Sequence, residues 1–313
     1  LSGGVFESTY RSINFQSAGN NLISGGIIKT GADFSVSFAD KFAPTGGKFE
    51  FIGDKELCMV EVNQSQGNYF HDLWINKTSG SVYLTSETLV QEDIYILSGN
   101  LVNNENSLLV EGDWFRNTNS GGFTSEAPVR FVGAEKSIIK SNEQFYSLII
   151  DKSGNYPNNL EILENRQVNV DNITFIDGVL EMKDLSILAV FSDLTLPDGC
   201  GILCSDTQWV HIVLYGNFTD NNAEINENQG FSWGESILSM TGTGNRQLSA
   251  PLHYLYFNEL LINLTPVGEV ASECHILNDN AEFHGELGVV QGTLSTENSA
   301  RLVCHKDFYT NFE

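Results

Sequence analysis

Cysteine, proline and basic residues are all scarce in this chain. Its 313 residues include five cysteines and six prolines. An odd and sparse set of cysteines does not fit a disulfide-stapled scaffold, so stability must come from packing. No proline- and serine-rich stretch divides the chain, which argues against flexible linkers between separate domains.

The few basic residues, 16 Lys and Arg, stand against 40 Asp and Glu, a formal charge of −24. This charge repels phosphate backbones and anionic lipid headgroups, so no nucleic-acid partner and no membrane-surface role is expected. No run of about 18 apolar residues occurs, so membrane insertion is not expected either. The same charge keeps a repetitive β protein soluble and limits pairing between exposed strand edges.

Helix signals are missing too, because no segment of about twelve residues places apolar side chains at i, i+3, i+4 and i+7. Strand patterns occur instead. Segments such as 81–86 (SVYLTS), 93–99 (DIYILSG) and 208–216 (QWVHIVLYG) alternate β-branched, aromatic and polar residues beside Gly, Asn, Asp or Ser. The sequence therefore predicts an all-β protein.

The spacing of the strands decides which kind of β protein this is. Apolar pairs recur after about 20 residues, at Leu73/Ile75, Ile94/Ile96 and Trp114/Phe115. Further series keep the same step: Val82/Leu84 to Leu101, Leu89/Val90 to Leu108/Val110, and then Leu148/Ile150, Val168/Val170 and Ile187. Interleaved series with one period are typical of a three-faced coil, in which each turn lies above the last. We expect a right-handed parallel β-helix (β-solenoid) with about 20 residues per coil.

Longer copies overlie the coils. The pattern Phe-x-x-Leu-x-Ile begins at Phe70, Phe145 and Phe257. A shorter pattern of the type S-G-x-L follows each copy, at 98–101 (SGNL), 177–180 (DGVL) and 291–294 (QGTL). Because the order of these patterns is kept, each long unit is interpreted as several coils copied together.

These copies predict one continuous β-solenoid over 1–313, with degenerate long repeats roughly at 1–69, 70–144, 145–256 and 257–313. Tandem β-sandwich domains are the alternative, since units of this length also suit a sandwich. A 20-residue sub-period has no reason to exist in a Greek key, so the solenoid is favoured.

The motif F-x-x-L-x-I-x-K-x-S-G at Phe70–Gly80, its counterpart at Phe145–Gly154, and the G-D-W of 112–114 resemble the repeat region of Bacteroidota-type secreted surface adhesins. Such chains are often exported by the type IX system, and some are similar to gliding or attachment adhesins. The last copy departs from the pattern, with INLTP in place of the Lys and Ser-Gly, and the opening residues match worst. The resemblance implies an extracellular, cell-surface stalk or adhesive surface and brings no catalytic residues.

Polysaccharide cleavage, another use of a β-helix, would need clustered carboxylates, with or without Ca²⁺ and a base. One acidic region has a single cation, Lys183, and its carboxylates are mostly at turn positions: Asp171, Asp177, Asp184, Asp193 and Asp198. We interpret them as solvated turn residues. Bound Ca²⁺ is the alternative, although no calcium-binding nonapeptide or EF-hand loop is present.

Metal chemistry is suggested by CGILC at Cys200–Cys204 and by the pairs Cys274/His275 and Cys304/His305. Neighbouring residues in a strand point to opposite faces, so each Cys-His pair is poorly placed to hold one tetrahedral ion. We interpret these four cysteines and Cys58 as small buried apolar residues. If the chain is exported, disulfides are the next interpretation, and a zinc site is the last.

No nucleophile elbow, P-loop, dinucleotide fingerprint or H-E-x-x-H is present, and none of the six histidines has an evident orienting partner: His71, His211, His253, His275, His284 and His305. No enzyme activity is therefore expected, nor any catalytic, cofactor-binding or metal residue. Trp114 is expected in the core. Stacking platforms for sugar rings are an alternative role for the other aromatic residues: Trp74, Trp209, Trp233, Tyr69, Tyr83, Tyr95 and Tyr156.

The sequence thus predicts a noncatalytic structural or adhesive segment of a secreted cell-surface protein, acting as a rigid stalk and display scaffold. Its start, LSGGVFESTY, lacks a secretion signal and opens on a strand pattern, so a mature piece of a longer surface polypeptide is expected. A glycan or a host or neighbour cell surface is the expected partner. The alternative is a β-helix that binds or cleaves polysaccharide.

Overall fold

A computed structural model describes residues 1–16, 22–154, 157, 159–226, 229–268, 270–297 and 301–310. The protein is a β-solenoid of about 13 turns, with 59% of its residues in strands and 1% in helix. Its strands pair in parallel between coils of about 22 residues, which confirms the predicted β-helix and excludes tandem antiparallel sandwiches. The coil is slightly longer than predicted because the corners vary in length: the step between register partners is 20 residues from Ile94 to Trp114 and 25 residues from Trp114 to Ile139.

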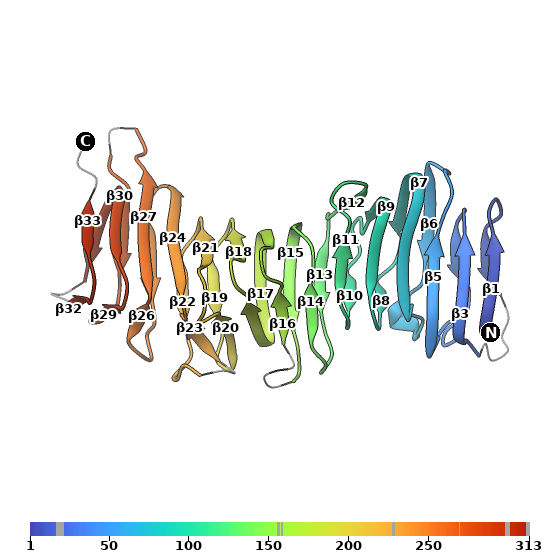
Figure 1. Ribbon diagram of the computed structural model, residues 1–313, viewed down its shortest axis with the longest axis horizontal. Helices are drawn as coiled ribbons and strands as arrows, with labels where there is room; N and C mark the ends of the chain where they lie inside the picture. Colours follow the sequence, from blue (N-terminus) through green and yellow to red (C-terminus); the bar gives the residue numbers. More distant parts are fainter. Residues whose placement is uncertain are drawn as a thin grey trace. The chain divides into compact units, whose positions relative to one another are not determined.

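The chain divides into two compact units, Leu1–Leu148 (unit 1) and Ile149–Glu313 (unit 2). Each is a stack of parallel coils (Figure 1). The boundary between the units lies close to the expected repeat boundary at 144/145. The single continuous solenoid over 1–313 and the four long repeats stay predictions.

In unit 1 one face is the ladder β1–β3–β5–β7–β9–β11, and other faces carry β2–β4–β6 and β8–β10–β13. The strands of this unit are β1 (Ser2–Ser8), β2 (Ile13–Phe15), β3 (Ser24–Thr30), β4 (Phe34–Val36), β5 (Gly46–Phe51), β6 (Leu57–Glu61), β7 (Asp72–Leu84), β8 (Thr88–Val90), β9 (Ile94–Val102), β10 (Leu108–Val110), β11 (Trp114–Arg116), β12 (Gly121–Thr124), β13 (Pro128–Phe131) and β14 (Ser137–Ile139), with the 3-10 turn η1 (Gln64–Gln66) and with β15 (Glu143–Asp151) running past its end.

In unit 2 the described strands form four ladders along the coils: β16–β17–β20–β23, β18–β21–β24–β27–β30–β33, β19–β22–β25–β28–β31 and β26–β29–β32. The strands are β16 (Leu160–Ile162), β17 (Gln167–Met182), β18 (Ile187–Val190), β19 (Leu194–Leu196), β20 (Cys200–Cys204), β21 (Val210–Leu214), β22 (Phe218–Asp220), β23 (Gly230–Ser232), β24 (Ser236–Thr243), β25 (Arg246–Ser249), β26 (Leu255–Phe257), β27 (Glu259–Thr265), β28 (Glu273–Ile276), β29 (Asn280–Phe283), β30 (Leu287–Gln291), β31 (Thr293–Thr296), β32 (Arg301–Cys304) and β33 (Phe308–Thr310).

The core of each unit is a set of vertical columns. In unit 1, Leu73 pairs with Ile94 and Ile94 with Trp114, and all three are fully buried, as the 20-residue step predicted. In unit 2 a column of paired residues, each at most 3% exposed, runs through five coils: Leu188, Ile212, Leu238, Leu260 and Leu287. Residues two apart in a strand share a face, so alternate apolar residues fill the interior.

The repeated pattern Phe-x-x-Leu-x-Ile is the inward ridge of a coil. All nine apolar side chains of the three copies are at most 1% exposed: Phe70, Leu73, Ile75, Phe145, Leu148, Ile150, Phe257, Leu260 and Ile262. The copies recur because every coil needs the same bulky side chains at the same inward positions.

The glycine of the S-G-x-L pattern lies at a bend within a strand. Gly99 has φ +80°, and a Cβ there would lie 2.8 Å from Lys77 Cβ of the preceding coil. Gly178 has φ +91°, and a Cβ there would lie 2.5 Å from the Lys152 carbonyl oxygen. Both the positive φ and the close approach of the coils require glycine.

The aspartate of G-D-W joins one coil to the next. Asp93 Oδ1 accepts a hydrogen bond from the Asp113 backbone N–H at 2.8 Å, and Asp113 Oδ1 accepts one from the Ile138 N–H at 2.8 Å. In unit 2, Asn217 Oδ1 accepts one from the Gln247 N–H at 2.9 Å. These side chains satisfy backbone donors at the corners, which gives the motif a structural role.

Within the described part of the chain, no helix has the length and apolar character that a membrane span requires.

Candidate functional site

Among the aromatic contacts on the outside of the coils are two rows of three rings, a tilted one in unit 1 and a stacked one in unit 2. The tryptophan row of unit 1 consists of Trp74, Tyr95 and Phe115, which are register partners in β7, β9 and β11. The ring centres of Trp74 and Tyr95 are 4.5 Å apart, and those of Tyr95 and Phe115 are 6.0 Å apart. Lys48 extends the row, with its Nζ 3.7 Å from the centre of the Trp74 ring.

Carboxylates flank this row. The Tyr95 hydroxyl donates a hydrogen bond to Asp93 Oδ2 at 2.9 Å. Burial, together with that bond and the charges of Asp93, Asp113 and Asp72, raises the pKa of Tyr95 to about 12. The phenol is therefore a neutral hydrogen-bond donor at every physiological pH.

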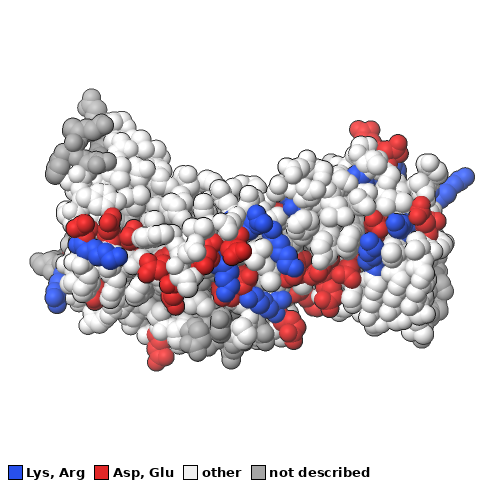
Figure 2. Space-filling view, in the orientation of Figure 1, with Lys and Arg blue, Asp and Glu red and all other residues white. Residues whose placement is uncertain are grey.

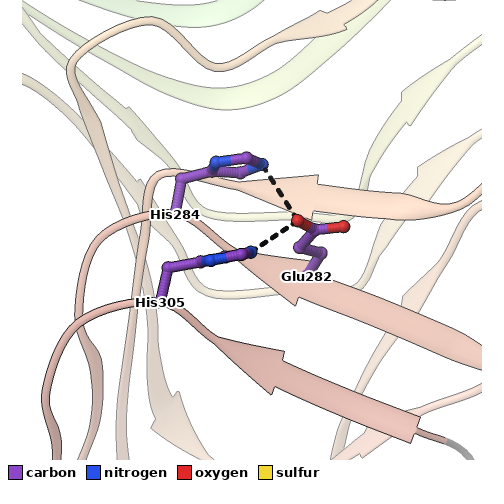
Figure 3. A group of neighbouring side chains, drawn as sticks. All are labelled: Glu282, His284 and His305. Atoms are coloured by element: carbon purple, nitrogen blue, oxygen red, sulfur yellow. Dashed lines mark hydrogen bonds and ion pairs between the residues drawn. The ribbon is translucent and has the colours of Figure 1, made fainter.

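The second row, in unit 2, contains two histidines and a carboxylate. Phe283 at the end of β29 pairs with Cys304 at the end of β32, so the residues that follow, His284 and His305, lie one above the other. Glu282 precedes His284 by two positions and shares its face. Figure 3 shows both rings on the same side as the Glu282 carboxylate, with one edge of each turned toward it.

The three side chains are in direct contact. His305 Nε2 is 2.6 Å and His284 Nε2 is 3.5 Å from the same oxygen, Glu282 Oε1. One donor atom from each residue can be chosen such that all three lie within 4.8 Å of one another. The side chains of Glu282, His284 and His305 are 33%, 39% and 48% exposed, so the group is open to solvent.

Aromatic side chains enclose one side of this group. Trp233 stacks flat on His284, with ring centres 4.8 Å apart and planes at 12°, and His284 stacks on His305 at 5.0 Å and 18°. We call Trp233, His284 and His305 the histidine row. Tyr256 lies 6.4 Å from His284 and also lines a pocket of about 170 Å³ that includes Glu282 and Arg301.

A larger pocket of about 690 Å³, lined by His253, Tyr254, Asn278 and Asp279 among others, lies beside a buried ion pair. His253 Nε2 is 3.3 Å from Oδ2 of the fully buried Asp220, at an angle that does not meet hydrogen-bond geometry, and His253 Nδ1 is 2.5 Å from the Tyr254 carbonyl oxygen.

Both ring nitrogens of His253 thus face oxygen acceptors. The contact with Asp220 raises the pKa of His253, against the opposing effect of burial. Burial raises the pKa of Asp220, but the contacts with His253, Asn222 and Phe231 outweigh it and hold that pKa below its ordinary value. The raised pKa of His253 and the lowered pKa of Asp220 both favour the charged form of this pair.

Of the acidic residues singled out from the sequence, Asp184 and Asp198 lie in turns and Asp193 directly follows a bend, whereas Asp171 and Asp177 lie within β17. Asp193 Oδ1 accepts a hydrogen bond from the Asn217 N–H at 2.7 Å, and Asp184 accepts one from the Thr207 hydroxyl at 2.7 Å. Asp171, Asp177 and Asp198 are exposed. Turn positions are therefore found for Asp184 and Asp198 but not for Asp171 and Asp177, which are outward residues of a strand, and the calcium alternative stays untested.

The cation of that region, Lys183, is paired elsewhere. It contacts Glu181 and lies 3.6 Å from Glu161, two register partners in β17 and β16. The two glutamate side chains are only 5% and 7% exposed, so a sugar cannot approach them. No sequence pattern predicts this pair, because it depends on which coils are adjacent.

The five cysteines are free thiols, and four of them are buried: Cys58, Cys200, Cys204 and Cys274, with Cys304 half-buried. Burial raises the pKa of Cys200 to about 11 and those of Cys204 and Cys274 to about 12. They are the buried apolar cysteines that the sequence predicted. In this structure the alternative disulfides are not formed.

The aromatic residues proposed as platforms differ in how far they are buried. Trp114 is fully buried, as expected, while Trp209 is 44% exposed and Tyr69 and Tyr83 are half-buried. Tyr156 lies outside the described residues. Only Trp74 and Tyr95 of this set form a stacked pair in unit 1, and Trp233 belongs to the histidine row.

The histidine row was missed from the sequence although a signal for it exists. His284 and His305 are 21 residues apart, which is one coil. The coil period was applied only to apolar ridges, and applying it to outward polar residues would have brought these two together.

Comparison with known proteins adds no relative: neither a family model, nor a curated protein, nor a solved structure matches this chain.

Proposed function

We propose that this chain is a noncatalytic structural or adhesive segment of a secreted cell-surface protein, part of a longer polypeptide, and that it acts as a rigid stalk and display scaffold. The observation that supports the proposal is the long parallel register of neighbouring coils. In unit 2, for example, β24 and β27 pair over seven consecutive residues, from Ile237 with Glu259 to Thr243 with Thr265.

This register supports stiffness in each unit. Hydrogen bonds between parallel strands of adjacent coils run along the stacking direction, so bending must lengthen a whole ladder at once. The core columns lie beneath those ladders and are closed to water. A coil of this kind keeps its outward residues at fixed spacing, which is what a display scaffold needs.

The surface suits an exported spacer. On the face in Figure 2, acidic side chains are interleaved with the less numerous basic ones. The net charge of −24 opposes self-association and keeps exposed edges apart. A glycan, or a host or neighbour cell surface, is the proposed partner, and export to the extracellular cell surface is part of the proposal.

A test of location and one of activity address this proposal. Antibodies raised against the chain should label intact, unpermeabilised cells of the organism that encodes it, and labelling only after permeabilisation would contradict the proposal. In a degradation screen against acidic and neutral polysaccharides, the chain should release no new reducing or unsaturated ends. Release that persists in several preparations would favour the enzyme alternative.

A second function, polysaccharide binding, is favoured by the tryptophan row. Trp74 and Tyr95 present stacked, partly exposed rings beside the Asp93 carboxylate, a combination of apolar faces and hydrogen-bonding groups that sugar rings use. On a glycan array the wild-type chain should then bind a small set of glycans. Replacing Trp74 by Ala should remove that binding, while replacing Trp209, an exposed tryptophan of unit 2, by Ala should not.

A further inference from the structure

The group of Glu282, His284 and His305 has the composition of a transition-metal site. Two imidazoles and one carboxylate are the protein ligands of one common class of zinc site, and further coordination positions are then left for water or another ligand. Calcium is a poor match, because it prefers six to eight oxygen ligands and two of the three donors here are nitrogens.

The positions of the donors also fit. Nε2 of His305 and Nε2 of His284 are turned toward one carboxylate oxygen, at 2.6 Å and 3.5 Å, with no backbone segment between them (Figure 3). Around zinc, ligand bonds of about 2.0–2.1 Å place donor atoms about 3.3 Å apart. The observed spread of up to 4.8 Å is wider, and closing it needs about 1–1.5 Å of side-chain movement. Side chains that are one third to one half exposed have room for that movement.

The surroundings hold the ligands in place. The Trp233 ring lies flat on His284, and His284 lies flat on His305, so the rotamers of both imidazoles are restricted before any ion arrives. Such packing raises metal affinity, because less rotamer freedom is lost on binding. An imidazole nitrogen binds a metal in the plane of its ring, so the two nearly parallel rings must tilt toward each other as part of the side-chain movement described above. The coil register beneath them, Phe283 with Cys304, fixes the separation of the two backbones.

We propose that Glu282, His284 and His305 bind one divalent transition-metal ion of the zinc class on the outside of unit 2. The ion would join two successive coils through their side chains, in addition to the backbone ladder between β29 and β32. Since it binds the folded state and has no such site in the unfolded chain, it would stabilise this part of unit 2.

The neighbouring thiol belongs to a different environment. Cys304 Sγ lies 3.5 to 3.7 Å from the carbonyl oxygens of Gly285, Lys306 and Asp307, and it is not part of the three-residue group. Replacing Cys304 by Ser is therefore a useful control, because it changes a potential zinc ligand beside the site without touching the three proposed ones.

The experiment uses the full chain, free of any affinity tag and treated with chelator. Isothermal titration with ZnCl₂ should show one binding event per chain, and CaCl₂ should give none at the same concentrations. The same sample titrated with CoCl₂ should develop visible absorption bands from a site with nitrogen ligands. The melting temperature should rise in the presence of zinc.

Variants locate the site. His305→Ala should weaken zinc binding at least tenfold and abolish the cobalt bands, and because His305 is the most exposed of the three, its loss should leave the circular dichroism unchanged. Glu282→Gln should also weaken binding. Cys304→Ser and His71→Ala should bind zinc as the wild type does. His71 is a matched control because it is a histidine of unit 1 whose Nδ1 lies 2.9 Å from the Asp72 carboxylate.

Zinc binding that is equal in the wild type and His305→Ala would overturn the proposal, because the ion would then be held elsewhere on the acidic surface. Absence of binding in the wild-type chain would overturn it as well. Neither result bears on the stalk function, which does not depend on a metal.

Discussion

The tryptophan row and the histidine row are built by the same device and present different chemistry. In unit 1 the rings come from successive coils and lie 4.5 and 6.0 Å apart. In unit 2, His284 and His305 come from successive coils and lie 5.0 Å apart, whereas Trp233 comes from the coil before that of Phe257 and reaches His284 at 4.8 Å. The rings of unit 1 are tilted by 35° and 51°, and those of unit 2 are nearly parallel, at 12° and 18°. The coil thus sets the spacing, and the residue type decides whether the row suits a sugar or an ion.

The sharpest test of this comparison sets an outward ring against an inward one. Trp114 is fully buried and packs edge-on against Phe123 and Phe145, whereas Trp74 is outward and only half-buried. We expect Trp114→Ala to lower the free energy of unfolding by about 3–5 kcal/mol because it leaves a cavity. Trp74→Ala should cost only about 1 kcal/mol, from lost stacking.

Urea denaturation of both variants, followed by circular dichroism, measures the two costs. Equal losses would mean that the outer rows are structural, and their proposed ligand roles would lose their basis.

The spacing between coils should increase when a glycine at a close contact is replaced by a larger residue. Gly99 and Gly199 have nearly the same backbone angle, φ +80° and +79°, but a Cβ at Gly99 would meet Lys77 Cβ at 2.8 Å while one at Gly199 would meet nothing within 4 Å. Gly199→Ala should cost about 1 kcal/mol from the positive φ alone. Gly99→Ala should cost about 3 kcal/mol, because the coils must also move apart.

Thermal melts of this pair separate conformational strain from coil contact. A Gly99→Ala variant no less stable than Gly199→Ala would show that coils near the tryptophan row do not approach as closely as described.

The two units should also differ in their response to pH, because unit 2 contains the Asp220–His253 pair. The pKa of His253 is raised from 6.5, so its stabilising effect is complete below that value and is lost as the pH rises through the folded-state pKa. The pKa of Asp220 is lowered from 3.8, so its effect is present above that value and is lost as the pH falls through the folded-state pKa. The pair is therefore most stabilising between about pH 4 and pH 6.5.

Hydrogen exchange of residues 218–257, compared between the wild type and His253→Gln, checks this prediction. The difference in protection should be largest in that window and shrink above it. A difference that grows from pH 7 to pH 9 would contradict the assignment of a charged His253.

Much of the fold was predictable because a solenoid repeats one physical requirement. Every coil must fill the same interior positions, so Leu73, Ile94 and Trp114 recur at nearly equal steps, and the interior columns follow from the sequence alone. Gly99 and Asp113 were visible as recurring motifs, but their purpose was not, since a bend or a corner bond is recognised only when the neighbouring coil is known.

The outer sites were harder to predict, because their contacts also depend on which coils are neighbours. His284 and His305 are one coil apart and were within reach of the period. Asp220 and His253 are not, because the corners between their strands differ in length and the residue numbers carry no simple step. Such contacts depend on irregular corners, which hydrophobic periodicity does not describe.

The central claim, that coils stack in parallel and in register, has a direct test by disulfide mapping. Thr195 of β19 and Thr219 of β22 are register partners, so cysteines placed at both should lie about 5 Å apart at Cα, within reach of a disulfide. A second variant with cysteines at Thr195 and Asn221 shifts the pair by two residues on the same face, to about 8 Å, beyond that reach. Under mild oxidation, peptide mapping should find the 195–219 bridge in high yield and the 195–221 bridge in trace amounts. Equal yields, or a preference for the shifted pair, would contradict the stacked coil.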